Sequence, residues 1–294
     1  MLVLLLGGAW YYFYCSCPVG NGPAGQAISR EKFATAWTTR NVLLVGIGDS
    51  VTDGFGARKK YSYFDRLIEN PVDEFVDMRG ICLKTVLPGL ATTNLAVSGT
   101  TSFEHLEKQL PRLRFAGSNV FGLIVMTTGG NDLIHNYGRT LPKENAMYGA
   151  TLSEARPWIS SFDDRLEKML AGISSAFPGG YRLFIADIFD PTDGKGDTQR
   201  AGLPQWKDCE AILSAYNDVI HRFAVRHPEV RLVQVHDAFL GHGIHCTQPW
   251  SGHYHSEDPH YWYYDNLEDP NERGYDAMRR LFLLEIAKSS VELK

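Results

Sequence analysis

The chain has 294 residues, of which 44% are hydrophobic, 12% aromatic and 21% charged. This is the composition of an ordinary globular protein, so it excludes an intrinsically disordered chain, a collagen and a coiled coil. The formal net charge is -5 at pH 7, from 34 acidic and 29 basic residues that form no long run of one sign. The sequence therefore shows no basic run that would bind nucleic acid, and we expect no nucleic-acid partner.

The chain begins with an almost wholly apolar segment, MLVLLLGGAWYYFY, which is followed by Cys15, Ser16 and Cys17. This segment is short for a membrane span, which needs about 20 residues, but it fits the apolar region of a signal peptide. No lysine or arginine precedes it, and Tyr14 and Ser16 make a poor cleavage or lipid-attachment site. We expect an exported or membrane-tethered protein. The alternative is a cytoplasmic protein in which this segment is a buried N-terminal strand.

Residues 18–27 are rich in proline and glycine and are typical of a linker. The sequence therefore divides into a signal-like or anchor-like segment with its linker, residues 1–27, and one folded domain, residues 28–294. The five cysteines are an odd number, are widely spaced and include no C-x-x-C pair. Neither a disulfide framework nor a cysteine-rich zinc module is predicted.

From about residue 41, apolar runs alternate with helical patterns, which is typical of β-α units and a mostly parallel sheet. The runs are nearly continuous in valine, isoleucine, leucine and phenylalanine, as expected for strands covered on both faces. In chain order, the expected strands are 42–48, 93–97, 121–128, 181–188 and 230–235. Apolar residues at steps of three and four predict helices over 158–173, 209–223 and 278–286. We predict an α/β fold of three layers, α/β/α, around a five-stranded parallel sheet.

Ligands of a parallel sheet bind beyond the carboxyl ends of its strands, so the residues that follow each strand matter most. The first strand leads directly into Gly48, Asp49 and Ser50. A serine on a tight strand-to-helix turn exposes its hydroxyl beside helix N–H groups that can stabilise an oxyanion. The simpler interpretation is that Ser50 caps the helix. The motif is not a G-x-S-x-G elbow, because Thr52 replaces the second glycine, and Val51 excludes a dinucleotide fingerprint.

The next two strands also end in residues that suit a cleft. The second strand contains Asn94 and leads to Gly99, whose backbone N–H can reach a ligand without a side chain in the way. The third strand ends in Gly129, Gly130 and Asn131, where paired glycines can turn the chain so that the asparagine amide faces the same cleft. Each of these signals is weak alone, since a turn would use the same residues.

Together, the three strand ends resemble the SGNH (GDSL-type) hydrolase superfamily, and their order is more specific than any one of them. The resemblance spans residues 42–132. It implies a flavodoxin-like fold and an esterase-type serine hydrolase in which Ser50 is the nucleophile. It also implies that the Ser50 N–H, the Gly99 N–H and the Asn131 side chain are the oxyanion donors.

The C-terminal part departs from the family, which normally closes with D-x-x-H-P-N before the last helix. The matching stretch here is NLEDPN, in which Asp269 stands in the place of the histidine and Asn266 in that of the aspartate. A carboxylate is a poor general base for a serine hydroxyl unless its pKa is strongly perturbed. We therefore expect Asp269 only to cap the last helix.

The nearest substitute for the missing base is His260, nine residues upstream of Asp269. Glu257 precedes His260 by the three-residue spacing of the family, and Asp258 precedes it by two. We favour Asp258 as the carboxylate that orients His260, because its shorter side chain resembles the family residue, and Glu257 remains the alternative. On this hypothesis a loop carries His260 over Ser50. Otherwise His260 is an exposed loop histidine.

Six histidines fall within the 25 residues 236–260, and His253 and His255 could point two rings at one metal ion. No H-E-x-x-H helix or second ligand pair accompanies them, so we expect no metal ion and no organic cofactor. The aromatic residues 261–264 could wall a pocket for sugar rings or acyl groups, or they could simply pack the long loop.

The predicted activity is the hydrolysis of a carboxylic ester of a small molecule or a carbohydrate, as by an esterase, a lipase or a carbohydrate O-deacetylase. Ser50 attacks the carbonyl to form an acyl-enzyme, His260 takes and returns the proton, and Asp258 orients His260. Two alternatives remain. One is an acyltransferase that uses the same site. The other is a binding module of the same fold that has lost turnover, a possibility raised by Asp269 in the place of the histidine.

Overall fold

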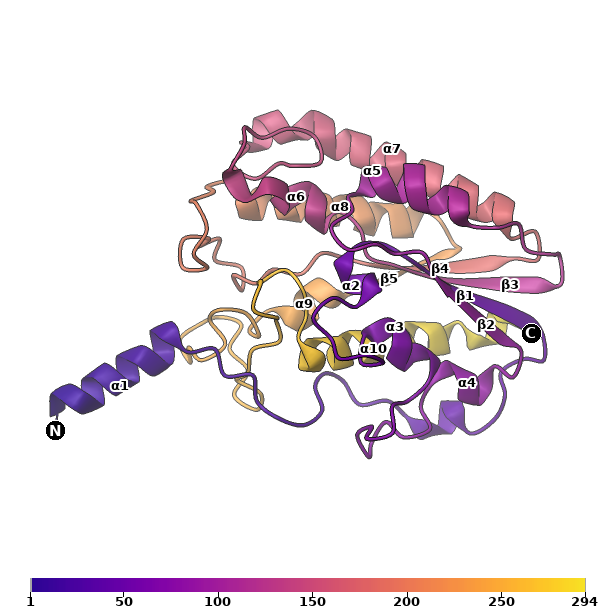
Figure 1. The fold of residues 1–294 in the computed structure, drawn as a ribbon, viewed down its shortest axis with the longest axis horizontal. Coiled ribbons are helices and arrows are strands. Elements are labelled where there is room, and N and C mark those ends of the chain that lie inside the picture. Colours follow the sequence, from indigo (N-terminus) through magenta and orange to yellow (C-terminus); the bar gives the residue numbers. More distant parts are fainter. Residues whose placement is uncertain (1, 294) are drawn as a thin grey trace.

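The structure is a computed structural model that describes the backbone of residues 2–293 and the side chains of residues 6–291. Its centre is a five-stranded sheet in which every neighbouring pair of strands is parallel (Figure 1). In spatial order the strands are β2 (Leu90–Asn94), β1 (Asn41–Ile47), β3 (Val120–Met126), β4 (Tyr181–Ala186) and β5 (Val230–Val233). The predicted parallel α/β sheet is thus confirmed.

Helices cover both faces of this sheet because its strands alternate apolar side chains between two cores. Val45 and Ile47 of β1 pack with helices α7 (Leu152–Ala176) and α8 (Cys209–Arg226). Leu44, from the same strand, packs on the opposite face with α10 (Glu272–Lys288) and α3 (Tyr63–Ile68). The three predicted helices are confirmed as parts of α7, α8 and α10. The three layers of the prediction are therefore present.

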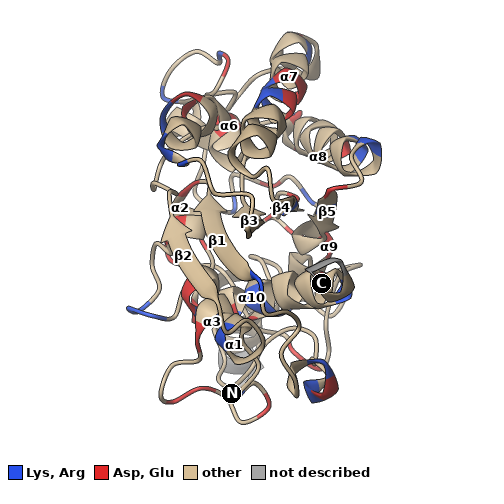
Figure 2. Cartoon of the chain, turned by 90° about the vertical axis from the view of Figure 1, so that its right-hand side faces the viewer, with Lys and Arg blue, Asp and Glu red and all other residues tan. Residues whose placement is uncertain are grey.

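Short helices connect these layers. They are η1 (Arg30–Phe33), α2 (Ser50–Asp53), α4 (Leu83–Val86), α5 (Ser102–Glu104), the π-helix η2 (His105–Gln109), η3 (Leu110–Arg112), α6 (Gly130–Ile134), η4 (His135–Gly138), α9 (Val235–Phe239) and η5 (Ser290–Leu293). Lysine and arginine lie beside aspartate and glutamate on the outer helices α7 and α8 (Figure 2). Arg226 of α8, for example, pairs with Asp163 and Glu167 of α7.

The second strand lies earlier in the chain than expected. The apolar run predicted a strand over 93–97, whereas β2 ends at Asn94. As an edge strand, β2 leaves much of its side-chain surface exposed and needs no continuous apolar run. Leu95 and Val97 lie past it and still donate backbone hydrogen bonds to the carbonyls of Gly46 and Gly48. The chain therefore keeps following β1 as far as the carboxyl end of the sheet.

The apolar N-terminal segment forms helix α1 (Leu2–Cys15), which projects from the body of the protein (Figure 1). It is a largely exposed helix, so the alternative of a buried strand is wrong. Its C-terminal end contacts the body, where the Trp250 ring lies 5.1 Å from the ring of Phe13. Within the described residues, no helix is long and apolar enough to cross a membrane. Export or membrane tethering stays a prediction.

The linker that follows α1 is held against helix α10. The Ala24 N–H donates to Asp276, and Arg273 donates to the carbonyls of Asn21 and Gly22. The linker thus lies on the folded body. The division of the chain between residues 27 and 28 stays a prediction.

A buried ionic network joins helices α3 and α10 to the loop that follows α3. Glu74 in this loop lies between Arg66 of α3, at 2.5 Å, and Arg279 of α10, at 2.6 Å. Asp276 pairs with the same two arginines, and all four side chains are almost fully buried. An ion removed from such a network leaves its partners charged and desolvated, which costs more than the pair itself contributed. The network therefore makes the packing of α3 on α10 sensitive to any single change of charge.

We expect Glu74→Gln to lower the free energy of unfolding by about 3–5 kcal/mol, because Arg66 and Arg279 lose a buried counter-charge. The matched control is Glu69→Gln, which breaks an exposed pair with Lys84 and should change the stability far less, because solvent screens that pair. Urea unfolding followed by circular dichroism measures both. If both variants lost the same free energy of unfolding, the buried network would contribute no more to stability than the exposed pair does.

Candidate active site

Ser50 lies where β1 ends and helix α2 begins, at the carboxyl edge of the sheet. Gly48 approaches β3 so closely that a Cβ there would lie 2.5 Å from the carbonyl oxygen of Thr127. Asp49, rather than Ser50, caps α2, and its carboxylate accepts from the Val51 N–H at 3.1 Å and the Thr127 hydroxyl at 2.8 Å. Ser50 is thus the first residue of the helix, and its hydroxyl is not used as the cap. The simpler interpretation of Ser50 as a helix cap is therefore wrong.

Asn131 belongs to helix α6 and lines the same cavity as Ser50. The Asn131 amide donates to the carbonyl of Thr100 at 2.9 Å. On the other side of Gly99, the Ser98 hydroxyl donates to Asp53 of α2 at 2.6 Å. Gly99 is thereby held between the helix of Ser50 and the side chain of Asn131. Its backbone has a positive φ of 79°, and nothing lies within 4 Å of the position that a Cβ would take. The oxyanion roles of Ser50, Gly99 and Asn131 stay a prediction.

Sequence reasoning missed the buried polar side chains that support this edge of the sheet. Gln109 donates to the Gly48 carbonyl at 2.7 Å and accepts from the Gly48 N–H at 2.9 Å, which fixes the turn before Ser50. Asp132, next to Asn131, accepts from the Ser102 N–H and from Arg165 and is fully buried. These residues are far apart in the sequence, and no spacing in the motif indicates them.

The carboxylate beside the Ser50 hydroxyl is Asp269. One of its oxygens, Oδ2, accepts from the Asn266 amide at 2.7 Å. The Ser50 hydroxyl lies near the Asp269 carboxyl. The other oxygen, Oδ1, is buried and makes no hydrogen bond among the described residues. The stretch that matches the closing motif of the family thus lies beside Ser50, with changed residues.

The expectation that Asp269 caps the last helix is wrong. The cap of α10 is Asn271, whose side chain accepts from the N–H groups of Arg273 and Gly274. The Asn271 amide also donates to the carbonyls of Tyr261 and Tyr263. These bonds fix the start of α10 two residues beyond Asp269 and leave the Asp269 side chain free to face Ser50.

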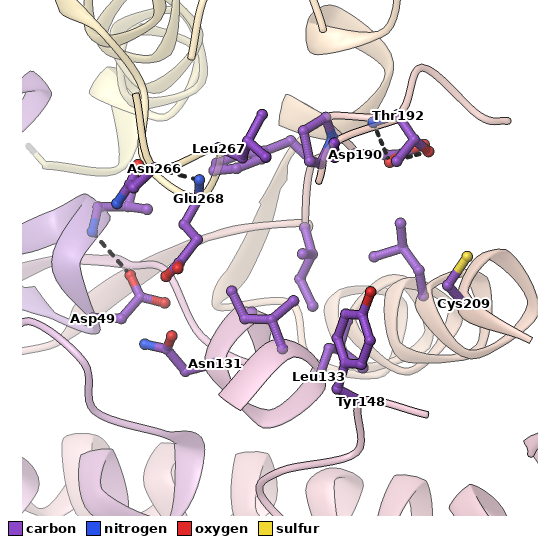
Figure 3. A pocket seen from close by; sticks show the side chains of 18 of the residues that line it. Asp49, Asn131, Leu133, Tyr148, Asp190, Thr192, Cys209, Asn266, Leu267 and Glu268 are labelled. Atoms are coloured by element: carbon purple, nitrogen blue, oxygen red, sulfur yellow. Dashed lines mark hydrogen bonds between the residues drawn. The ribbon is translucent and has the colours of Figure 1, made fainter. Parts of the chain in front are cut away.

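Two further carboxylates, those of Asp49 and Glu268, lie near Asp269. The Glu268 side chain points toward those of Asp49 and Asn131 (Figure 3). Burial, together with the neighbouring carboxylates, raises the pKa of Asp49 to about 7 and that of Glu268 to about 7. Burial also raises the pKa of Asp269, although hydrogen bonds from Asn266 and Ser50 oppose the rise. The site can therefore hold and release protons near neutral pH without a histidine.

Beyond these polar groups lies a cavity of about 150 Å³ (Figure 3). Ser50, Asn131 and Glu268 line it together with apolar side chains from four segments of the chain: Leu133, Ile134, Tyr148, Ile188, Trp206 and Leu213. A hydrocarbon group bound there would be removed from water, at a gain of about 0.8 kcal/mol for each buried methylene. The cavity therefore suits an apolar group attached to the atom that Ser50 would attack.

The structure does not bring His260 to Ser50. The Asp258 carboxylate lies 2.6 Å from the Nδ1 of His260, so these two residues form the predicted pair. The alternative carboxylate, that of Glu257, is exposed. This pair lines a different cavity, of about 550 Å³, together with linker residues 21–26. Arg273 donates to both oxygens of Asp258 at 2.6 Å and holds the pair there. The expected loop over the nucleophile is therefore not formed.

Three other histidines of this region have partners in the protein. The Nε2 of His255 bonds the Leu240 carbonyl, His245 pairs with Asp197, and the His242 ring stacks on Trp262. In the part of the chain that the structure describes, no three histidine, cysteine, aspartate or glutamate side chains form a group that could hold a metal ion. Trp262 and Tyr263 are buried in the core, so the loop-packing alternative describes them better than a pocket wall beside Ser50.

The chain is similar to known proteins in sequence and in fold. The model of the GDSL-like lipase/acylhydrolase family matches residues 47–277, which include Ser50, Asn131 and Asp269. The search of curated proteins gave no match.

Several solved structures share the fold. An extracellular lipase from Streptomyces rimosus is 20% identical, with a TM-score of 0.53 over 84% of this chain and 99% of its own. An α/β hydrolase enzyme from the metagenome of Lake Arreo is 17% identical, with a TM-score of 0.51 over 87% and 99%. An acetylxylan esterase from Geobacillus stearothermophilus is 18% identical, with a TM-score of 0.50 over 84% and 94%. At these identities the similarity establishes the fold.

The raised pKa of Glu268 predicts how stability depends on pH. In the folded protein Glu268 keeps its proton up to about pH 7, whereas in the unfolded chain it ionises near pH 4.3, about its ordinary pKa. Between these values the folded state binds more protons, so the contribution of Glu268 to stability is lost as the pH rises. Glu268→Gln should therefore be more stable than the wild type at pH 8 and nearly equal to it at pH 4.5. We expect a difference on the order of 1–3 kcal/mol at pH 8, which is less than the full shift implies because solvent partly screens this half-buried side chain.

Urea unfolding at both pH values measures this difference. The exposed Glu257→Gln is the matched control, which we expect to give the same small change at each pH. A gain for Glu268→Gln that did not grow with pH would contradict the raised pKa.

Proposed function

Because the chain belongs to the GDSL-like lipase/acylhydrolase family, we propose that it hydrolyses carboxylic esters with an apolar acyl group, using Ser50 as nucleophile and Asp269 as the proton acceptor. The observation that carries this proposal is the Asp269 carboxyl beside the Ser50 hydroxyl. Ser50 attacks the ester carbonyl, its proton passes to Asp269, and the alcohol leaves with that proton. Water then hydrolyses the acyl-enzyme, with Asp269 again accepting a proton.

The buried setting of Asp269 supports its role as a base. An ordinary aspartate is too weak a base at neutral pH, but a carboxylate whose pKa is raised by burial holds a proton more firmly. The Asn266 amide bonds one oxygen of Asp269, which orients the carboxyl as the aspartate of the usual motif orients its histidine. Asn266 is therefore a positioning residue in this mechanism.

The negative charge that develops on the carbonyl oxygen needs donors in a site already rich in carboxylates. Asp49 and Glu268 are both held near pKa 7, so a proton shared within the cluster lowers its net charge. The N–H groups of Ser50 and Gly99 and the Asn131 amide supply the oxyanion donors in this proposal. Removing one such donor typically costs about 10²–10³ in kcat.

The neighbouring cavity supports an acyl group longer than acetyl as the preferred substrate. Its lining is largely apolar around Leu133 and Leu213, which favours an uncharged hydrocarbon acyl group there. The alcohol part of the ester would leave on the side of the site that opens to solvent.

The role of Asp269 is tested with Asp269→Asn, which keeps the shape of the side chain and removes its basicity. We expect kcat/KM for an ester substrate to fall by about 10²–10⁴. Ser50→Ala should fall by at least about 10⁴. The exposed Asp265→Asn, in the same segment, is the matched control and should retain full activity.

His260→Ala discriminates between the two candidate bases. On the present proposal it keeps turnover, because its cavity is separate from that of Ser50. Loss of activity in His260→Ala together with an active Asp269→Asn would reject Asp269 and restore the histidine prediction.

The acyl preference is tested with p-nitrophenyl esters of increasing acyl length. Leu203 lines the cavity from a half-buried loop position, so Leu203→Trp fills the cavity with little strain on the core. We expect this variant to lose about tenfold or more in kcat/KM for the longer esters while its activity on the acetyl ester changes little.

Leu141→Trp, at an exposed leucine outside the cavity, is the matched control. If Leu203→Trp lowered kcat/KM by the same factor for all esters, the cavity would not be the acyl site.

A further inference from the structure

Two free thiols from opposite ends of the chain meet where helix α1 joins the body. Cys246 is fully buried, and Cys17 is partly buried against the core cluster that contains Cys246. The Cys246 thiol lies within hydrogen-bonding reach of the Cys17 sulfur. The mechanism of ester hydrolysis uses neither residue.

The backbone on both sides of Cys17 is held to the segment that carries Cys246. On one side, the carbonyl of Phe13 accepts from the Gln248 amide at 3.0 Å. On the other side, the carbonyl of Pro18 accepts from the Tyr261 N–H at 2.8 Å. Since both anchors lie within four residues of Cys17, the two sulfurs stay near each other while the rest of α1 projects outward.

The surroundings also favour Cys17 as the thiol that reacts first. The hydrogen bond from Cys246 lowers the pKa of the Cys17 thiol, burial opposes this, and the positive charge of Arg200 adds to the lowering. That hydrogen bond and burial raise the pKa of the Cys246 thiol. Because thiolates are the nucleophiles of disulfide exchange, Cys17 attacks and Cys246 resolves.

We propose that Cys17 and Cys246 form a disulfide that links the N-terminal segment covalently to the catalytic body under oxidising conditions. The oxidant is a small disulfide such as oxidised glutathione. The Cys17 thiol loses its proton and attacks one glutathione sulfur, which breaks that S–S bond and releases one glutathione thiol. Cys246 then loses its proton and attacks the Cys17 sulfur, releasing the second. Two cysteine thiols are oxidised and one glutathione disulfide is reduced.

The other cysteines make suitable controls. Cys15 is exposed and lies two residues from Cys17. Cys82 lies 3.2 Å from the Thr85 hydroxyl, and Cys209 bonds the Gly196 carbonyl. None of these three thiols has a contact with Cys246 among the described residues.

The test uses the full chain, treated with either oxidised glutathione or dithiothreitol and then alkylated and digested without reduction. We expect a peptide linking Cys17 to Cys246 in the oxidised sample only, with a fall from five alkylated thiols to three. Cys17→Ser should abolish this peptide, and Cys15→Ser, the matched control, should retain it. Because Cys246→Ser could disturb the core, Cys17→Ser is the primary variant.

A second measurement is the melting temperature of the folded protein. Oxidation should raise it in the wild type and in Cys15→Ser, since a link that closes a long loop restricts the unfolded chain, and should leave it unchanged in Cys17→Ser. A Cys15–Cys246 or Cys15–Cys17 peptide, a mixed disulfide of Cys17 that does not resolve, or five alkylated thiols after oxidation would each overturn the proposal.

Discussion

The site depends on one contact, that of the Ser50 hydroxyl with the Asp269 carboxyl in a buried setting. A carboxylate can occupy this place only because Asn266 bonds one of its oxygens and because Asn271, not Asp269, begins helix α10. The same burial that raises the pKa of Asp269 also raises those of Asp49 and Glu268. In the proposed mechanism, this burial is what makes the Asp269 carboxylate basic enough to accept the proton of Ser50.

Burial of this kind has a cost in stability. Three carboxyl groups in one partly apolar site favour their neutral forms, so the folded protein becomes less stable as the pH rises toward 7. The adjoining apolar cavity benefits from the same exclusion of water, because it can accept a hydrocarbon acyl group. The proposed proton acceptor and the proposed acyl site therefore share one physical origin.

The sequence predicted the parallel sheet, because its buried strands are continuous apolar runs. It also predicted that Ser50 and Asn131 face one cleft, because strand ends meet at one edge, and both residues line the same cavity. It did not place His260, since no local spacing shows where a loop folds. Asp193 binds the N–H groups of Gly241, Gly243 and His245, and Arg273 clamps Asp258. These long-range bonds carry His260 to another cavity. The sequence also could not predict the raised pKa of Asp269, because that shift arises from burial in the folded protein.

The most direct test of the central claim is the pH dependence of the rate at which a fluorophosphonate labels Ser50. In the wild type, we expect the labelling rate to fall at low pH as a carboxyl group becomes protonated. This acid limb of the pH–rate profile should persist in His260→Ala. In Asp269→His it should move to about pH 6.5, the ordinary pKa of histidine. An acid limb that is unchanged in Asp269→His but lost in His260→Ala would contradict the account and show that Asp269 does not accept the proton of Ser50.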